Sequence, residues 1–314
     1  VDVRELARVV TAELDALDRL AVDAGALSAL GDPLLDRRLD ERLREVAHTA
    51  LLLVAAQARS GAVARAARAV RAATTIGERA RAVEILDATL PRAIAARVVP
   101  MLDPGALAAR VHGARARRGP VALDAAITAE LTGGDRLTRD LLLRALPPAR
   151  RREFKGVLTS AAHAAAAAIS PLDLLRRVTA DVDDDDVSAI DVLLVLAEVP
   201  ALAGLSTPQL AAVADRGDVL TLAPGAAVAS DGERLDALLV VLDGAIAAGD
   251  RRVTRGQAVD ELAAIAPRPT ARIAALEPTR LFRLRRLDLD ELIDDEPGLG
   301  SALVRYLGEA LRSR

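Results

Sequence analysis

Aromatic side chains are scarce in this 314-residue chain, at 1% of the sequence: there is no Trp, one Tyr (Tyr306) and two Phe (Phe154 and Phe282). Proteins that bind single-stranded nucleic acid stack the bases on aromatic rings, and cages for organic cations are built from several rings. The composition therefore argues against a site that stacks nucleic-acid bases, and it excludes an aromatic cage for a cation.

Cysteine is absent, which excludes disulfides, thiolate metal sites and cysteine nucleophiles. Lys155 is the only lysine, so arginine carries nearly all of the positive charge. The 42 basic and 45 acidic residues give a net charge of -3, so the chain as a whole does not attract phosphate backbones. There is no signal-peptide pattern and no apolar run long enough to span a membrane.

Catalytic motifs are also lacking. The sequence contains no P-loop and no Gly-x-Ser-x-Gly elbow. The three histidines, His48, His112 and His163, lie on separate predicted helices, so a metal site is not indicated. A basic cluster, Arg150-Arg151-Arg152 with Lys155, either contacts an anionic lipid or a partner, or is the solvated start of a helix. We therefore expect no enzymatic activity.

Helical periodicity runs from Val1 to about Leu196, with apolar residues three and four positions apart. The second helix is expected to begin after Asp32-Pro33, a capping residue followed by proline in the first turn. Glycines separate the helices that follow. We expect these helices at about residues 60–73, 77–90, 91–102, 104–117, 119–132, 135–146 and 148–168.

Two of these helices look repeated, because similar apolar patterns follow Gly77 and Gly119, 42 residues apart. That spacing lies within the period of HEAT or armadillo helix pairs, and a generic helical bundle is the alternative. The segment from Ala82 to Asp103 resembles the HEAT-type repeat of bacterial proteins that join a transporter-like membrane region, HEAT repeats and a cyclic-nucleotide-binding-like domain.

An acidic run at residues 181–186 follows the helical region. It lacks the spaced ligands and the glycine of an EF-hand loop, so we interpret it as a solvated cap before a helix that starts near Val187. The expected organisation is a HEAT-like helical domain at 1–180, an acidic linker at 181–190 and a second domain at 191–314.

Short runs rich in Val, Leu and Ile, separated by turns such as Pro224-Gly225 and Asp243-Gly244, begin after Asp218. They predict a compact β-roll of about eight strands, followed by helices at 287–294 and 299–312. This order of elements resembles that of the cyclic-nucleotide-binding domain family, and the matching sequence segments run from Leu193 to Arg312. The predicted fold class is α+β: an all-α HEAT-like solenoid followed by a C-terminal β-roll with flanking helices.

In that family a Gly-Glu pair opens a phosphate-binding cassette, the Glu accepts a hydrogen bond from the ribose 2′-OH, and a later Arg neutralises the cyclic phosphate above a helix N-terminus. The segment from Gly256 to Leu276 resembles this cassette. The resemblance assigns Glu261 to the ribose and Arg268 to the phosphate. The candidate ligand-binding residues that it implies are Asp260, Glu261, Leu262, Ala263, Arg268 and Thr270.

The cassette departs from the family pattern at three points. Asp260 stands where the family has Gly, which adds bulk and a negative charge beside a bound phosphate. Arg268 follows Glu261 by only seven positions, and Pro269 removes a backbone N–H directly after Arg268. Arg272 is a second candidate for the phosphate. Two interpretations stay open: a weak cyclic-nucleotide site, or a structural or docking domain without a ligand.

The sequence therefore predicts a non-enzymatic regulatory or sensor module that couples the β-roll to a helical interaction surface. No resident cofactor is expected, and cAMP or cGMP is the candidate ligand. The expected partner is a protein or a membrane region of the same polypeptide. No nucleic acid is expected, because no helix-turn-helix follows the β-roll before Arg314. The start at Val1 rather than Met suggests a fragment, so the alternative is the soluble docking part of a larger transporter-like protein. The expected location is the cytoplasm or the cytoplasmic face of a membrane.

Overall fold

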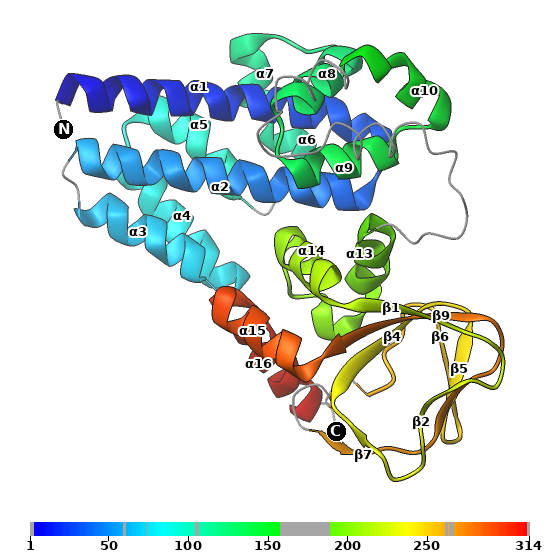
Figure 1. The fold of residues 1–314 in the computed structure, drawn as a ribbon. Coiled ribbons are helices and arrows are strands. Elements are labelled where there is room, and N and C mark those ends of the chain that lie inside the picture. Colours follow the sequence, from blue (N-terminus) through cyan, green and yellow to red (C-terminus); the bar gives the residue numbers. More distant parts are fainter. Residues whose placement is uncertain are drawn as a thin grey trace. The chain divides into compact units, whose positions relative to one another are not determined.

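The computed structural model describes residues 3–58, 61–73, 75–103, 107–157, 189–260, 263 and 267–312. The chain divides into two compact units, Val1–Thr179 and Ala180–Arg314, here called unit 1 and unit 2 (Figure 1). The acidic run at 181–186 and the alanine-rich stretch from residue 158 onward lie outside the described residues.

Two long helices form the centre of unit 1: α1 (Val3–Leu27) and α2 (Pro33–Gln57), each of 25 residues. A short turn of 3-10 helix, η1 (Ser28–Leu30), joins them, and Gly31 takes the left-handed conformation with φ 69° that ends this turn. The side chain of Asp32 accepts two backbone hydrogen bonds from the first turn of α2. The predicted start of the second helix is therefore confirmed.

Shorter helices complete unit 1: α3 (Gly61–Ala72), α4 (Ile76–Thr89), α5 (Arg92–Leu102), α6 (Leu107–Arg110), α7 (His112–Arg118), α8 (Leu123–Gly133), α9 (Arg136–Ala145) and α10 (Pro148–Glu153). The helix predicted at 104–117 is in fact two helices, because the chain turns at Val111. This turn directs the side chain of Arg110 inward, to the carbonyls of Pro100 and Met101.

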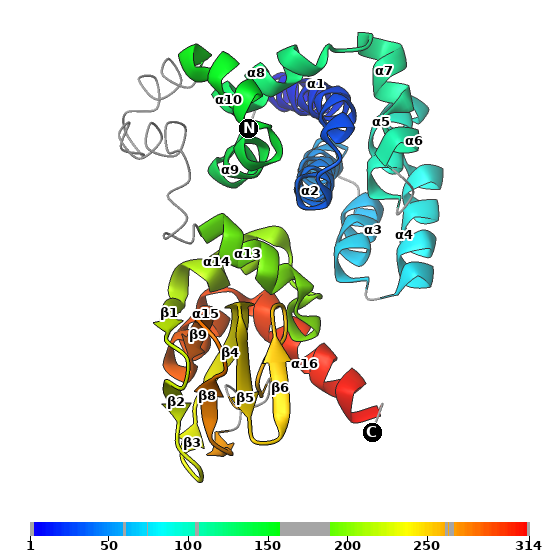
Figure 2. The ribbon, with the colours of Figure 1, turned by 90° about the vertical axis from the view of Figure 1, so that its right-hand side faces the viewer.

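The contacts of α1 and α2 show how unit 1 is organised. Helix α1 packs against α2, α5, α7 and α8, and α2 packs against α3, α5 and α9. Figure 2 views this central pair nearly end-on, with the shorter helices around it. In a solenoid, each repeat contacts only its neighbours. The observed packing around one pair fits the bundle alternative.

The two helices proposed as repeats do not have equivalent surroundings. Helix α4 packs against α3 and α5, whereas α8 packs against α1 and α9. The helices with similar apolar patterns after Gly77 and Gly119 therefore pack in two different ways. Their shared composition, rich in alanine and leucine, accounts for the similarity.

Arginine–carboxylate pairs tie the short helices of unit 1 to the central pair. Asp18 of α1 is 2% exposed and accepts from Arg117 of α7 at 2.6 and 3.0 Å. Arg97 of α5 contacts the same carboxylate at 2.9 Å and Asp15 at 2.6 Å. One buried carboxylate thus joins three helices, and charged partners are what make its burial tolerable.

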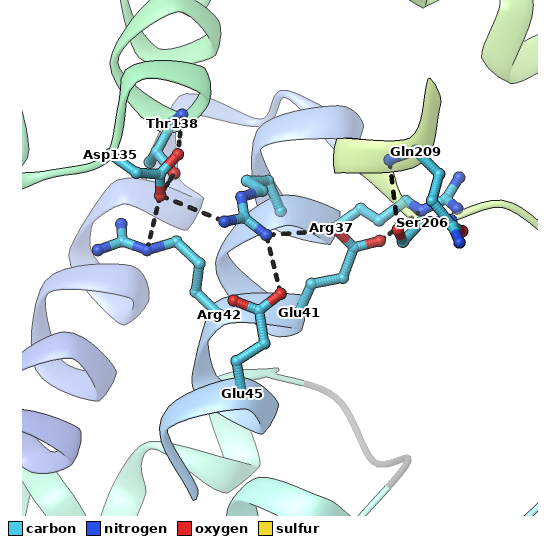
Figure 3. A network of polar contacts seen from close by, with 9 residues as sticks. Arg37, Glu41, Arg42, Glu45, Asp135, Thr138, Ser206 and Gln209 are labelled. Carbon is cyan, nitrogen blue, oxygen red and sulfur yellow. Dashed lines mark hydrogen bonds and ion pairs between the residues drawn. The ribbon is translucent and has the colours of Figure 1, made fainter. Parts of the chain in front are cut away.

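A second network joins α2 to α9 (Figure 3) and, through Glu130, to α8. Asp135 caps α9 by accepting from the backbone N–H and the hydroxyl of Thr138. Arg38 and Arg42 of α2 contact the same carboxylate at 3.3 and 3.0 Å. Arg42 also donates to Glu130 of α8 at 2.6 Å. Burial alone would raise the pKa of Asp135, but the bonds from Thr138 and the two guanidiniums outweigh it and lower the pKa.

Unit 2 is a β-roll flanked by helices. Two helices and a 3-10 turn precede the strands: α13 (Ala189–Glu198), η2 (Pro200–Leu202) and α14 (Thr207–Arg216). The helices α15 (Arg286–Asp295) and α16 (Pro297–Arg312) follow, as predicted. The strands are β1 (Asp218–Leu222), β2 (Ala227–Ala229), β3 (Arg234–Leu235), β4 (Ala237–Asp243), β5 (Ala245–Ala248), β6 (Arg251–Thr254), β7 (Arg268–Pro269), β8 (Ile273–Ala275) and β9 (Thr279–Arg285).

Three antiparallel sheets make up the roll, in the orders β1-β9-β4, β2-β8-β5-β6 and β3-β7. Aliphatic side chains from these strands fill its interior, and Leu239, Val241, Ile246 and Leu281 are each fully buried. Because strands from both ends of the segment pair with each other, the roll closes on itself and leaves short edges. Among the described residues, no helix has the length and apolar character needed to cross a bilayer.

Candidate ligand-binding site

The segment before the cassette is anchored to the roll. The backbone N–H of Gly256 donates to the carbonyl of Val241, and the N–H of Val259 donates to the carbonyl of Leu239. Ala258 and Val259 are both buried. Residues 256–259 therefore run along β4 as a short additional strand, which fixes the place where Asp260 leaves the roll.

Asp260 and Arg268 form a bidentate ion pair across the cassette. Nε of Arg268 donates to Oδ2 of Asp260 at 2.7 Å, and Nη2 donates to Oδ1 at 2.6 Å. The Asp260 side chain is 18% exposed and that of Arg268 is 49% exposed. Such parallel N–H···O bonds are among the strong hydrogen bonds of proteins. The hydrogen bonds and charge of Asp260 raise the pKa of Arg268 above its usual range, so the guanidinium stays fully charged.

The backbone of the cassette's far end is also fixed. Arg268 lies in β7, opposite Leu235 of β3. Thr270 donates its N–H to the carbonyl of Glu233 at 2.8 Å and accepts from the N–H of Gly232 at 2.9 Å. The position of the Arg268 guanidinium is therefore set by strand pairing as well as by Asp260.

The remaining candidate ligand-binding residues have different surroundings. Ala263 is fully buried and joins the apolar interior of the roll, and its N–H donates to the carbonyl of Asp260. Glu261 and Leu262 lie outside the described residues. Arg272 is exposed and precedes β8. The structure thus brings Asp260 and Arg268 together, and the role of the six residues in ligand binding remains a prediction.

Arg234 of β3 is a second cation at the cassette that the sequence analysis missed. Its Nη2 donates to the carbonyl of Pro267 at 2.9 Å, and no carboxylate pairs with it among the described residues. Its only signal in the sequence is a position between two predicted strands. Strand pairing of β3 with β7 places Arg234 opposite Pro269, and that pairing is invisible in a two-residue run.

The scarce aromatic residues are used for packing. Phe282 is fully buried in β9, and its ring lies against the backbone of Gly217, where an added Cβ would be 2.2 Å from two ring atoms. Phe154 in unit 1 lies under the guanidinium of Arg150, whose Cζ is 5.6 Å from the ring centre. The side chain of Tyr306 is outside the described part of the chain.

The basic cluster at residues 150–155 is largely engaged within unit 1. Arg150 pairs with Asp124 and with Glu153, and Arg151 donates to the carbonyls of Leu146 and Arg144. These bonds favour the interpretation as a helix start. Within the described residues, no group of three or more His, Asp or Glu side chains could hold a metal ion. His163 lies outside them.

No protein-family model and no curated protein matches the chain. Solved structures do match. The N-terminal domain of a transcriptional regulator from Streptomyces coelicolor A3(2) is 28% identical, with a TM-score of 0.36, over 38% of this chain and 93% of that one. A cyclic nucleotide-binding-like protein from Brucella abortus is 24% identical, with a TM-score of 0.30, over 33% and 98%. A cyclic nucleotide-binding domain from Methylobacillus flagellatus is 20% identical, with a TM-score of 0.35, over 40% and 77%.

Proposed function

We propose that the chain is a non-enzymatic regulatory module whose unit 2 is a cyclic-nucleotide-binding-like roll in which an internal carboxylate occupies the cassette arginine. The observation that carries this proposal is the bidentate pair between Asp260 and Arg268. It accounts for the departure from the family pattern, because the residue in place of Gly supplies the anion that Arg268 would otherwise take from a ligand.

A cyclic phosphate would have to compete with this pair. It would break two charge-assisted hydrogen bonds and then lie beside the negative charge of the Asp260 carboxylate. Both terms weaken binding, and every 1.4 kcal/mol costs about tenfold in affinity. We therefore propose that the chain binds cAMP or cGMP weakly or not at all.

Unit 1 is proposed as the interaction surface of the module. Buried ion pairs hold α5, α7 and α8 to the central α1/α2 pair, and apolar side chains attach α3, so that outer helix faces such as the arginine side of α3 stay exposed. A rigid scaffold with such outer faces suits a docking role. HEAT-type stacking is not needed for this proposal.

Calorimetric titration with cAMP and cGMP tests the ligand proposal. The full chain is expected to show no saturable heat up to roughly 1 mM nucleotide. Asp260→Gly frees Arg268 and restores room, so it is expected to tighten binding at least about tenfold. Asp260→Gly combined with Arg268→Ala is the matched control and is expected to lose that gain.

Two results would contradict the proposal. Micromolar binding by the unchanged protein that Arg268→Ala abolishes would mean that the ion pair opens readily for a phosphate. An Asp260→Gly protein that is folded by circular dichroism but gains nothing would mean that Asp260 is not what blocks the site.

A further inference from the structure

Helix α3 presents an arginine face that unit 1 does not use. Its buried residues are small and apolar: Val63, Ala66, Ala67 and Val70. Its exposed arginines recur at every third position, so they follow one side of the helix: Arg65, Arg68 and Arg71. The helix is thus attached by its apolar side, and the arginines contribute nothing to that attachment.

These three arginines are exposed, and no carboxylate of the described residues pairs with them. Among the described residues, none of the three forms an ion pair, and α3 itself contains no acidic residue. By contrast, the buried arginines, such as Arg97 and Arg110, form ion pairs with carboxylates. The pKa of His48 on α2 is lowered first by burial and then by the positive charge of Arg71.

A large apolar side chain lies at the end of this face. Ile76 is 77% exposed in the first turn of α4, directly after the three residues that connect α3 to α4. The side chain of Thr75 and that of Glu78 cap this turn reciprocally, so the position of Ile76 is fixed. An exposed isoleucine on a rigid turn is a contact point that the fold of unit 1 does not require.

We propose that Arg65, Arg68, Arg71 and Ile76, here called the α3 face, dock an acidic segment of a partner protein that carries carboxylates along one side and an apolar residue at its end. Arginine suits this partner because its planar fork binds carboxylates in a bidentate manner. The spacing of the three arginines matches carboxylates at helical intervals in a partner helix.

The neighbouring residues favour a protein over a membrane. Apart from the arginines, the exposed residues of α3 are small, namely Gly61, Ala62, Ala69 and Ala72, whereas a helix that inserts into a lipid surface needs large apolar side chains. A single row of three cations is also short for a nucleic-acid backbone, and the chain is net negative. Charge complementarity therefore points to an acidic protein segment.

This inference deepens the interaction role proposed for unit 1, and it does not depend on whether unit 2 binds a nucleotide. The calorimetric titration reports on unit 2, whereas the experiment below reports on α3. The two proposals can therefore fail separately.

The test is fluorescence anisotropy of a labelled synthetic helix with glutamates along one side and a terminal leucine, titrated with the full chain. A peptide with glutamine in place of glutamate is the matched probe. We expect the glutamate peptide to bind at least about tenfold tighter than the glutamine peptide at low salt, with the difference shrinking at high salt. Arg65→Ala, Arg68→Ala and Arg71→Ala together should remove the difference, and Ile76→Ala should weaken binding a few fold.

A triple variant elsewhere on unit 1, Arg8→Ala, Arg92→Ala and Arg152→Ala, removes the same charge from exposed positions and should leave binding within about twofold. Equal losses in the two triple variants would overturn the proposal, since the effect would then be one of net charge. No preference for the glutamate peptide would overturn it too. Arginine-dependent binding to phosphatidylserine vesicles or a DNA duplex in place of the peptide would assign the face to another anion.

Discussion

Asp18 and Asp15 contact the same arginine, yet they lie in very different surroundings. The side chain of Asp18 is 3% exposed and bridges Arg97 and Arg117, whereas that of Asp15 is 44% exposed. Asp18→Ala leaves two guanidiniums without their buried partner, so we expect a loss of about 3–5 kcal/mol in the free energy of unfolding. Urea unfolding followed by circular dichroism measures it.

Asp15→Ala is the control for this change, since it removes a carboxylate from the same Arg97 at the surface. Its effect is expected to be far smaller than that of Asp18→Ala, because exposed ion pairs contribute little. Similar losses in the two variants would show that burial is not what makes Asp18 important.

Asp23 on α1 gives a pH-dependent prediction at the residue scale. Burial raises the pKa of Asp23, Glu130 adds to the rise, and Arg118 and Arg19 oppose it. The folded chain then holds the proton more strongly than the unfolded chain, so the ionised form costs stability at neutral pH, and this cost falls as the pH drops through the raised pKa. Asp23→Asn is expected to raise the thermal midpoint at pH 7.

The gain from Asp23→Asn should shrink as the pH falls through the raised pKa of Asp23, because the folded chain then carries the neutral carboxyl. Thermal melts from neutral to acid pH measure this, with the exposed Asp87→Asn as the reference. A gain that stays constant across this range would contradict the assignment to ionisation.

The candidate site illustrates what residues alone can and cannot predict. Asp260 and Arg268 were both identified from the cassette pattern, and the charge of Asp260 was recognised as unfavourable for a phosphate. Their mutual pairing was not predicted, because it depends on how β7 and residues 256–259 are held by their neighbouring strands. The sequence signal for this ion pair is a carboxylate at one end of a loop with an arginine at the other end.

At the scale of elements, the backbone between α14 and β1 lies close against an aromatic ring. Gly217 lies against Phe282, and a Cβ there would also be 3.0 Å from the carbonyl oxygen of Arg283. Gly217→Ala forces the ring or the strand to move, and we expect a loss of about 1–3 kcal/mol in unfolding free energy.

Gly204→Ala is the matched control in the same unit, because the nearest atom to its added Cβ is 3.9 Å away in Ala302. Thermal unfolding of both variants should separate them by several degrees. Equal midpoints would show that the ring accommodates the methyl group without cost.

Periodicity predicted most elements because helices and strands bury one face at a fixed interval. It could not predict the turn at Val111, since Ala and Arg continue the helical pattern on both sides of it. It also missed the strands β3 and β7, which have two residues each and too few positions to show alternation.

For the whole molecule, the division into two units with separate cores leads to a prediction about local stability. Hydrogen–deuterium exchange followed by mass spectrometry should show faster exchange in α1, α5 and α7 after Asp18→Ala, and in β1 and β9 after Gly217→Ala. Faster exchange throughout the chain in either variant would show that the two cores unfold as one.

The order of the whole chain, helices followed by a roll with flanking helices, was predictable from the change of period near residue 200. The arrangement of unit 1 was not, because a solenoid and a bundle use the same amphipathic helices. What separates them is which helices pack against one another, and contacts between distant segments, such as the ion pair of Arg117 with Asp18, 99 positions apart in the sequence, leave no periodic signal.

The buried ion pairs of unit 1 have a consequence for how exactly its helices are placed. Alanine and leucine side chains are so alike that a helix could slide along its neighbour by one turn and still bury a similar surface. A guanidinium moved by one turn, about 5.4 Å, would lose its carboxylate altogether. The ion pairs of Asp18, Glu130 and Asp135 therefore fix the positions of the helices along one another. They select a single packing arrangement in a core that has few bulky side chains.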